Sequence, residues 1–140
     1  MIGSWESHLS FKEAVRLAEG GDRIYCATKS GLFFYHKTDH TVQTITKVEG
    51  LSDMDISSIV WDNNRDLLVV AYKNTNIDLI EDNVIHNIPD IKRKQLTGNK
   101  TIHNSLIIGN LTLNQLNNLT NGYVDTQSIL WSPAKKKVTP

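Results

Sequence analysis

Two aspartates at alternate positions, Asp53 and Asp55, have the spacing that most suggests a metal site in this sequence. Alternating carboxylates open the calcium loop of EF-hand proteins, which also needs glycine at its sixth position and glutamate at its twelfth. A loop that begins at Asp53 has Ser58 and Asn64 there, so the sequence excludes an EF-hand. We prefer a turn in which both aspartates accept hydrogen bonds from backbone N–H groups. A looser calcium site is the alternative.

The five histidines form no metal-binding pattern in the sequence. His36 and His40 are four residues apart, but they flank a predicted turn and have no third ligand near them. A zinc site needs three or four ligands. Positions at the surface or at strand edges are therefore predicted, and the same holds for the isolated His8, His86 and His103.

Signatures of catalysis are also missing from the sequence. The single cysteine, Cys26, excludes an internal disulfide framework, and its apolar surroundings predict a buried small hydrophobic residue. Neither GxSxG nor a phosphate-binding or dinucleotide-binding glycine motif occurs. A glycosidase would need paired carboxylates that face a channel, whereas Asp53, Asp55, Asp62 and Asp66 all fall in predicted turns. We expect no enzyme activity, no cofactor and no metal.

Charge and hydropathy narrow the range of partners. Fifteen basic and fifteen acidic residues cancel, so no overall field favours nucleic acid. The basic run at 90–100 is predicted to be an exposed loop, with contact to an anionic polymer as the alternative. The sequence contains no run of 18 apolar residues, the length that a membrane-spanning helix needs. The N-terminus lacks the pattern of a signal peptide, which fits either a cytoplasmic protein or a mature exported one.

The elements that must position these residues are short strands. Apolar runs of five or six residues alternate with Gly, Asn and Asp, which indicates antiparallel β structure. A helix over 11–19 is the one rival, because this stretch contains good helix formers. The predicted strands lie at 14–18, 23–28, 32–36, 42–47, 56–61, 67–72, 77–81 and 84–88.

These runs recur along the chain. Residues 23–28 correspond to 66–71 after 43 residues, 32–36 to 77–81 after 45, and 55–58 to 101–104 after 46. A four-strand unit with this period is typical of propeller blades, with Trp61 packed between two of them. We therefore predict an all-β fold of two to three antiparallel four-stranded blades, an incomplete propeller. The predicted divisions are a propeller-like part at 1–132, with blades at about 14–47, 56–88 and 102–131, and a flexible basic tail at 133–140.

Longer stretches carry a family resemblance over residues 2–104. They are IGSWESHLSF, AVRLAEGGDRIYCATKSGLFFYHK, EGLSDMDISSIVWD and YKNTNIDLIEDNVIHNIPDIKRKQLTGNKTIHN. Together they resemble the start of PorZ-like β-propeller proteins of the type IX secretion system of Bacteroidetes. The joint EGLSDMDISSIVWD is also similar to the blade repeat of sensor propellers in hybrid two-component systems.

The resemblance implies a non-catalytic binding or scaffold module at the cell surface or in the periplasm, with its signal peptide removed. It further implies protein partners in the secretion complex and contact with an anionic surface polysaccharide. A ligand-sensing propeller segment of an extracytoplasmic sensor is the alternative. Family members continue with more blades beyond residue 104, whereas this sequence becomes rich in asparagine. We therefore expect a fragment, a truncated product, or a protomer that self-associates through open blade edges.

Overall fold

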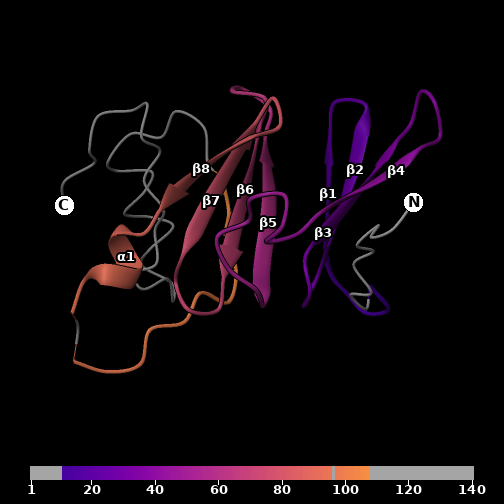
Figure 1. Cartoon of the computed structure of the whole chain (residues 1–140). Helices are drawn as coiled ribbons and strands as arrows, with labels where there is room; N and C mark the ends of the chain where they lie inside the picture. Colours follow the sequence, from indigo (N-terminus) through magenta and orange to yellow (C-terminus); the bar gives the residue numbers. More distant parts are fainter. Residues whose placement is uncertain (1–10, 96, 108–140) are drawn as a thin grey trace.

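Two four-stranded antiparallel sheets make up the computed structural model, which describes residues 11–95 and 97–107 (Figure 1). The first sheet contains β1 (Ala14–Gly20), β2 (Arg23–Thr28), β3 (Leu32–His36) and β4 (Val42–Ile45), in that order. The second sheet contains β5 (Ile56–Asp62), β6 (Leu67–Tyr72), β7 (Ile77–Glu81) and β8 (Val84–Ile88). The predicted fold class is confirmed, and residues 14–20 form a strand rather than the rival helix.

Short turns join neighbouring strands within each sheet. Asp82 and Asn83 connect β7 to β8 and have φ angles of 46° and 64°. Two consecutive positive φ values match the twist of the flanking strands, and Asn and Asp tolerate them better than most residues. Gly21, with φ of 60°, has the same role between β1 and β2. The turn residues thus determine where each meander reverses.

The two sheets lie face to face (Figure 1). We define the front face of the first sheet as the face that packs against the second sheet. The front face of the second sheet is the equivalent face by strand register, and the opposite face of each sheet is its back face. The back face of the second sheet packs on the front face of the first, and one cluster of buried side chains fills the contact. It includes Tyr25, Leu32 and Phe34 from the first sheet and Leu68, Val70 and Tyr72 from the second.

Trp61 closes this contact near one end of the strands. Its indole stacks on the ring of Tyr25, with centroids 5.7 Å apart and an interplanar angle of 20°. It also covers Gly20 so closely that a Cβ atom there would collide with the indole. The predicted position of Trp61 between two blades is confirmed.

The strand pairing shows that one of the predicted repeat spacings, the one between β2 and β6, is wrong by one residue. Ala27 pairs with Leu32, and Ala71 pairs with Ile77 at the same position of the second sheet. β6 therefore follows β2 after 44 residues, not 43. A slip of one residue exchanges the two faces of a strand. With 44 residues, Cys26 and Val70 both belong to back faces, as their positions require.

The first strand of each sheet contains a β-bulge at the same place. The pairing shifts register between Ala14 and Arg16 in β1, and between Ile56 and Ser58 in β5. Val15 and Ser57 are the residues at these shifts. An extra residue of this kind is unpaired, and it redirects the side chains beside it.

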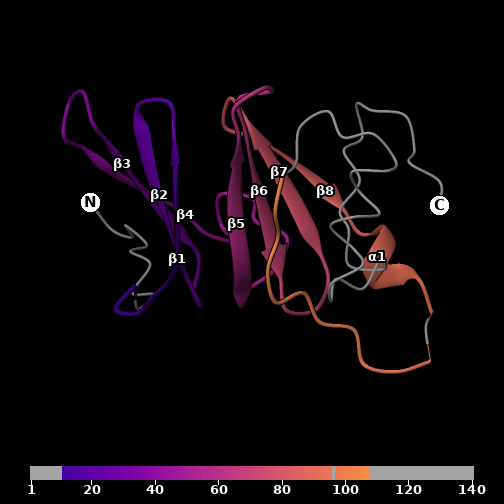
Figure 2. The same cartoon turned by 180° about the vertical axis from the view of Figure 1, so that it is seen from behind.

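After β8 the chain forms a single helical turn, α1 (Asp90–Arg93), where the sequence predicted only an exposed loop. Residues 101–107 then run across the front face of the second sheet (Figure 2), where Ile102 and Ile107 pack against Leu67, Val69 and Ile77.

The strand predicted to open a third blade is not formed over residues 102–107, because no described strand pairs with this segment. The rest of the predicted third blade at 108–131 and the predicted tail at 133–140 lie outside the described residues. Among the helices that the structure describes, none is long and apolar enough to cross a membrane.

Candidate functional site

The two aspartates of the candidate metal site lie in the joint between the sheets, and they face different partners. The Asp53 carboxylate accepts hydrogen bonds from the Asn76 side chain at 2.7 Å and from Lys92 Nζ at 3.0 Å. Asp55 has a φ of 58°, and its backbone N–H donates to Lys29 O while its carbonyl accepts from Lys73 N. Among residues 11–95 and 97–107, no group of three or more His, Cys, Asp or Glu side chains could hold a metal.

The detail of the predicted turn was therefore wrong. Asp53 binds side chains rather than backbone N–H groups, and Asp55 connects the sheets through its own backbone. Burial opposes ionisation of Asp53, but the hydrogen bonds from Asn74, Asn76 and Lys92 outweigh it and lower its pKa. This carboxylate belongs to a structural network.

The centre of that network is Asp78, which sequence reasoning missed. Asp78 is fully buried in β7, and its carboxylate accepts four hydrogen bonds. The donors are Ser52 N at 2.8 Å, Ser52 Oγ at 2.6 Å, Tyr72 Oη at 2.6 Å and Asn87 Nδ2 at 2.9 Å. The Asn87 amide also donates to Asn76, which holds Asp53. The signal in the sequence was a carboxylate inside an apolar strand.

Tyr72 shows how strongly this network favours one protonation state. Burial raises the pKa of its phenol, and the hydrogen bond to the Asp78 carboxylate raises it further. The phenol therefore stays protonated and donates. A fully satisfied buried carboxylate of this kind fixes the positions of β6, β7, β8 and the joint at Ser52.

His40, His86 and Cys26 occupy the places that the sequence suggested, whereas the His36 side chain at the end of β3 is only 14% exposed. His36 Nδ1 lies 3.6 Å from Asp22 Oδ2, and His40 Nδ1 bonds to the Tyr35 hydroxyl, so the two rings have separate partners. Cys26 is 5% exposed, and burial raises the pKa of its thiol. His86 is exposed in β8, whereas His8 lies outside the described residues.

Asp66 lies in the β5–β6 turn as predicted, whereas Asp62 is part of β5 rather than of a turn. Asp62 ends β5, is 4% exposed and pairs with Arg65. Burial opposes its ionisation, but the hydrogen bonds from Arg65 and Asn64 prevail and lower its pKa. Asp66 adopts a φ of 52° in the turn. The four aspartates considered for glycoside hydrolysis therefore have separate structural positions.

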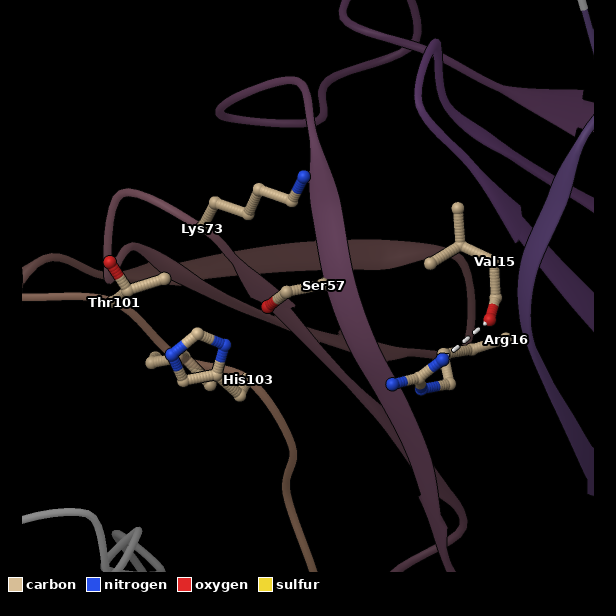
Figure 3. Close-up of a pocket in the computed structure, with 7 residues that line it drawn as sticks. Val15, Arg16, Ser57, Lys73, Thr101 and His103 are labelled. Atoms are coloured by element: carbon tan, nitrogen blue, oxygen red, sulfur yellow. Dashed lines mark hydrogen bonds between the residues drawn. The ribbon is translucent and has the colours of Figure 1, made fainter.

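A hollow of about 380 Å³ opens beside the start of β5 (Figure 3). Its walls come from parts of the chain that are far apart in the sequence, namely β1, the start of β5, Lys73 directly after β6, and residues 101–103. Its lining includes Val15, Arg16, Ser57, Lys73, Thr101 and His103. Sequence reasoning treated His103 as isolated and did not consider Arg16 or Lys73.

The back face of the first sheet is apolar and is exposed at Leu17 in β1 and Val42 in β4, whereas Cys26 in β2 is buried. Ile24, Tyr35 and Val42 pair in one row across the strands, and Leu17, Cys26 and Phe33 pair in the next. Leu17 is 67% exposed, Val42 is 60% exposed and Ile24 is 36% exposed. Phe11 packs edge-on against Phe33 at one side. The equivalent face of the second sheet is the one buried against the first.

A profile of the family described as the N-terminal β-propeller domain of PorZ, of the type IX secretion system, matches residues 24–114. A solved structure of PorZ from Porphyromonas gingivalis is similar with a TM-score of 0.69 and 26% identity. That protein is described as an essential bacterial surface component of the type IX secretion system.

The similarity covers 77% of this chain but only 15% of the PorZ chain, so the match concerns a small part of that protein. No curated protein sequence matches the chain significantly. The family profile spans more than half of the sequence and includes both four-stranded sheets from Ile24 onward. The chain belongs to the family of PorZ N-terminal β-propeller domains.

Proposed function

We propose that this chain is a non-catalytic binding or scaffold module of a type IX secretion system, acting outside the cytoplasm as the N-terminal propeller part of a PorZ-like surface component. Its family and its similarity to the surface component PorZ support this role. The blade boundaries near 14–47 and 56–88 belong to the same proposal.

The open back face of the first sheet is the observation that carries the proposal. By strand register, this face is equivalent to the back face of the second sheet. The pair Tyr35–Val42 in β3 and β4 corresponds to the pair Ile80–Ile85 in β7 and β8. Ile80 belongs to the cluster that fills the contact between the sheets, and Ile85 packs against this cluster. The partner surface that fits is therefore an apolar, blade-like sheet face, supplied by another protein or by further propeller sequence.

A charge placed on this face tests the proposal. In the bacterium that carries the gene, we expect the full chain with Val42→Asp to lose most delivery of type IX cargo to the cell surface. Val42 is 60% exposed, so the change leaves the fold intact while it places a carboxylate in the partner contact. Surface-exposed cargo, quantified against cargo retained in the periplasm, is the measurement.

Val48→Asp is the matched control, because Val48 is 84% exposed in the turn after β4 and lies off the back face. Normal delivery with Val42→Asp, or equal loss with both variants, would contradict the proposal.

Three finer expectations remain predictions. Self-association through the open blade edges predicts a dimer or larger species in light scattering, and a monodisperse monomer would contradict it. Contact with an anionic surface polysaccharide predicts binding to that polymer isolated from the same cells. The alternative, a sensor propeller, predicts a kinase encoded downstream in the same gene.

A further inference from the structure

The hollow beside β5 lies where the repeats of the chain coincide. Val15 and Ser57 occupy the register shifts of β1 and β5, which are equivalent positions of the two sheets. His103 follows Ser57 after 46 residues, the same spacing that relates Ser58 to Asn104. Ser58 Oγ bonds to Asn104 Oδ1 and to Ser105 Oγ, which holds this segment beside β5. Equivalent positions of the two sheets and the segment around His103 therefore line one space.

The chemistry of this space is cationic although the whole chain is neutral. Arg16, Lys73 and His103 bring N–H groups to the lining, and Thr101 brings a hydroxyl (Figure 3). No carboxylate belongs to the described lining. Positive groups gathered in a recess focus the field and attract a negative ligand more strongly than scattered surface charges do.

The N–H donors of this lining keep most of their hydrogen-bonding capacity. Arg16 donates one bond, from Nη1 to the Val15 carbonyl at 2.8 Å, and its guanidinium carries five N–H groups. Neither the Lys73 ammonium nor the His103 ring has a side-chain hydrogen bond within the described part of the chain. Arg16 forms no ion pair there either. An incoming anion would therefore displace no internal ion pair.

We propose that this hollow binds a small organic anion through a carboxylate or phosphate group. Arg16 would hold two oxygens of the group with its planar fork, and Lys73 would supply a second charge. The hydroxyl of Thr101 and the ring of His103 would bind neighbouring polar atoms. About 380 Å³ lies at the small end of ligand sites, which fits a molecule of monosaccharide size. The inference does not depend on the proposed secretion role.

Calorimetric titration of the full chain at low salt tests this site with three probes, namely glucuronate, inorganic phosphate and neutral glucose. We expect glucuronate or phosphate to bind with a Kd of about 1 mM and glucose to show no heat. The stronger anion identifies the group that the site prefers. Because the attraction is electrostatic, binding should weaken as salt is added.

Arg16→Gln should weaken binding about tenfold or more, since it removes charge-assisted hydrogen bonds. Arg93→Gln is the matched control at the exposed end of α1, away from the lining, and should bind as the wild type does. Circular dichroism checks that both variants fold. Binding of neither anion, equal binding of glucose, or unchanged binding by Arg16→Gln would overturn the proposal.

Discussion

The two sheets share one plan, yet their strands differ sharply in burial. Every residue of β6 is buried, because the first sheet covers the back face and residues 101–107 cover the front. In β1 only Gly20 is buried, and Leu17 is 67% exposed on the back face. A four-stranded sheet with two apolar faces needs a neighbour on each side. The second sheet has both neighbours among the described residues, and the first has one.

A second difference lies in the polar interior. Asp78 is the second residue of β7, and Phe33 is the second residue of β3 at the equivalent register position. In the second sheet the back face thus carries a hydrogen-bonded carboxylate, while the first sheet presents an aromatic ring there. Buried polar hydrogen bonds therefore fix the second sheet, whereas apolar surface dominates the corresponding face of the first.

The largest expected effect comes from removing the carboxylate that distinguishes the sheets. Asp78→Ala should lower the free energy of unfolding by about 3 kcal/mol or more, because Tyr72 Oη and Ser52 N lose their buried acceptor. Urea denaturation at pH 7 measures it. Glu81→Ala, at the exposed end of the same strand, should change stability by less than about 0.5 kcal/mol. Similar losses in both variants would remove the contrast.

A smaller effect tests the contact between the sheets against the open face. Trp61→Ala should cost about 2–3 kcal/mol, since it removes a half-buried indole from Tyr25 and leaves a cavity over Gly20. Leu17→Ala on the back face of the first sheet should cost less than about 0.5 kcal/mol. The measurement is thermal unfolding followed by circular dichroism. A cost for Leu17→Ala as large as that for Trp61→Ala would show that the back face is already covered.

The smallest expected effect separates a buried carboxylate from an exposed one by pH. The fold lowers the pKa of Asp62, so its stabilising contribution is present above about pH 4 and is lost as the pH falls through the folded value. Between pH 6 and pH 3, Asp62→Asn should lose less stability than the wild type does, because the variant has no carboxylate to protonate.

Glu19 in the first sheet also has a lowered pKa, through its hydrogen bond and charge interaction with Lys37. That pair is exposed and screened by solvent. Glu19→Gln should therefore follow the wild-type pH curve, and urea denaturation across the pH range compares the three proteins. A Glu19→Gln curve that parallels Asp62→Asn would contradict the distinction.

Local patterns in the sequence were enough to predict the eight strands. Alternating apolar runs and the turns at Gly21 and Asp82 act over a few residues, so they can be recognised without tertiary information. The one-residue difference between β2 and β6 could not be read in this way, because only the ladder to β7 determines which face Val70 takes.

The candidate site was harder to predict for the same reason. Arg16, Lys73 and His103 come together only when the sheets stack, and none of them has a neighbour in the sequence that suggests a ligand. The repeat spacing that aligns residues 55–58 with 101–104 pointed to part of this site, since it makes His103 equivalent to Ser57. Asp78 was visible as a charge in an apolar strand, but its four donors come from distant residues.

The fit of Trp61 onto Gly20 also gives the blades a stacking order. By strand register, Glu19 in β1 is equivalent to Trp61 in β5, and Gly20 in β1 is equivalent to Asp62 in β5. If copies of this chain were stacked head to tail, each would bring Glu19 against Asp62 of the next instead of an indole against a glycine. Two carboxylates in place of an aromatic contact disfavour that arrangement. The contact between Trp61 and Gly20 therefore favours packing of the second sheet on the first over continued head-to-tail addition of copies.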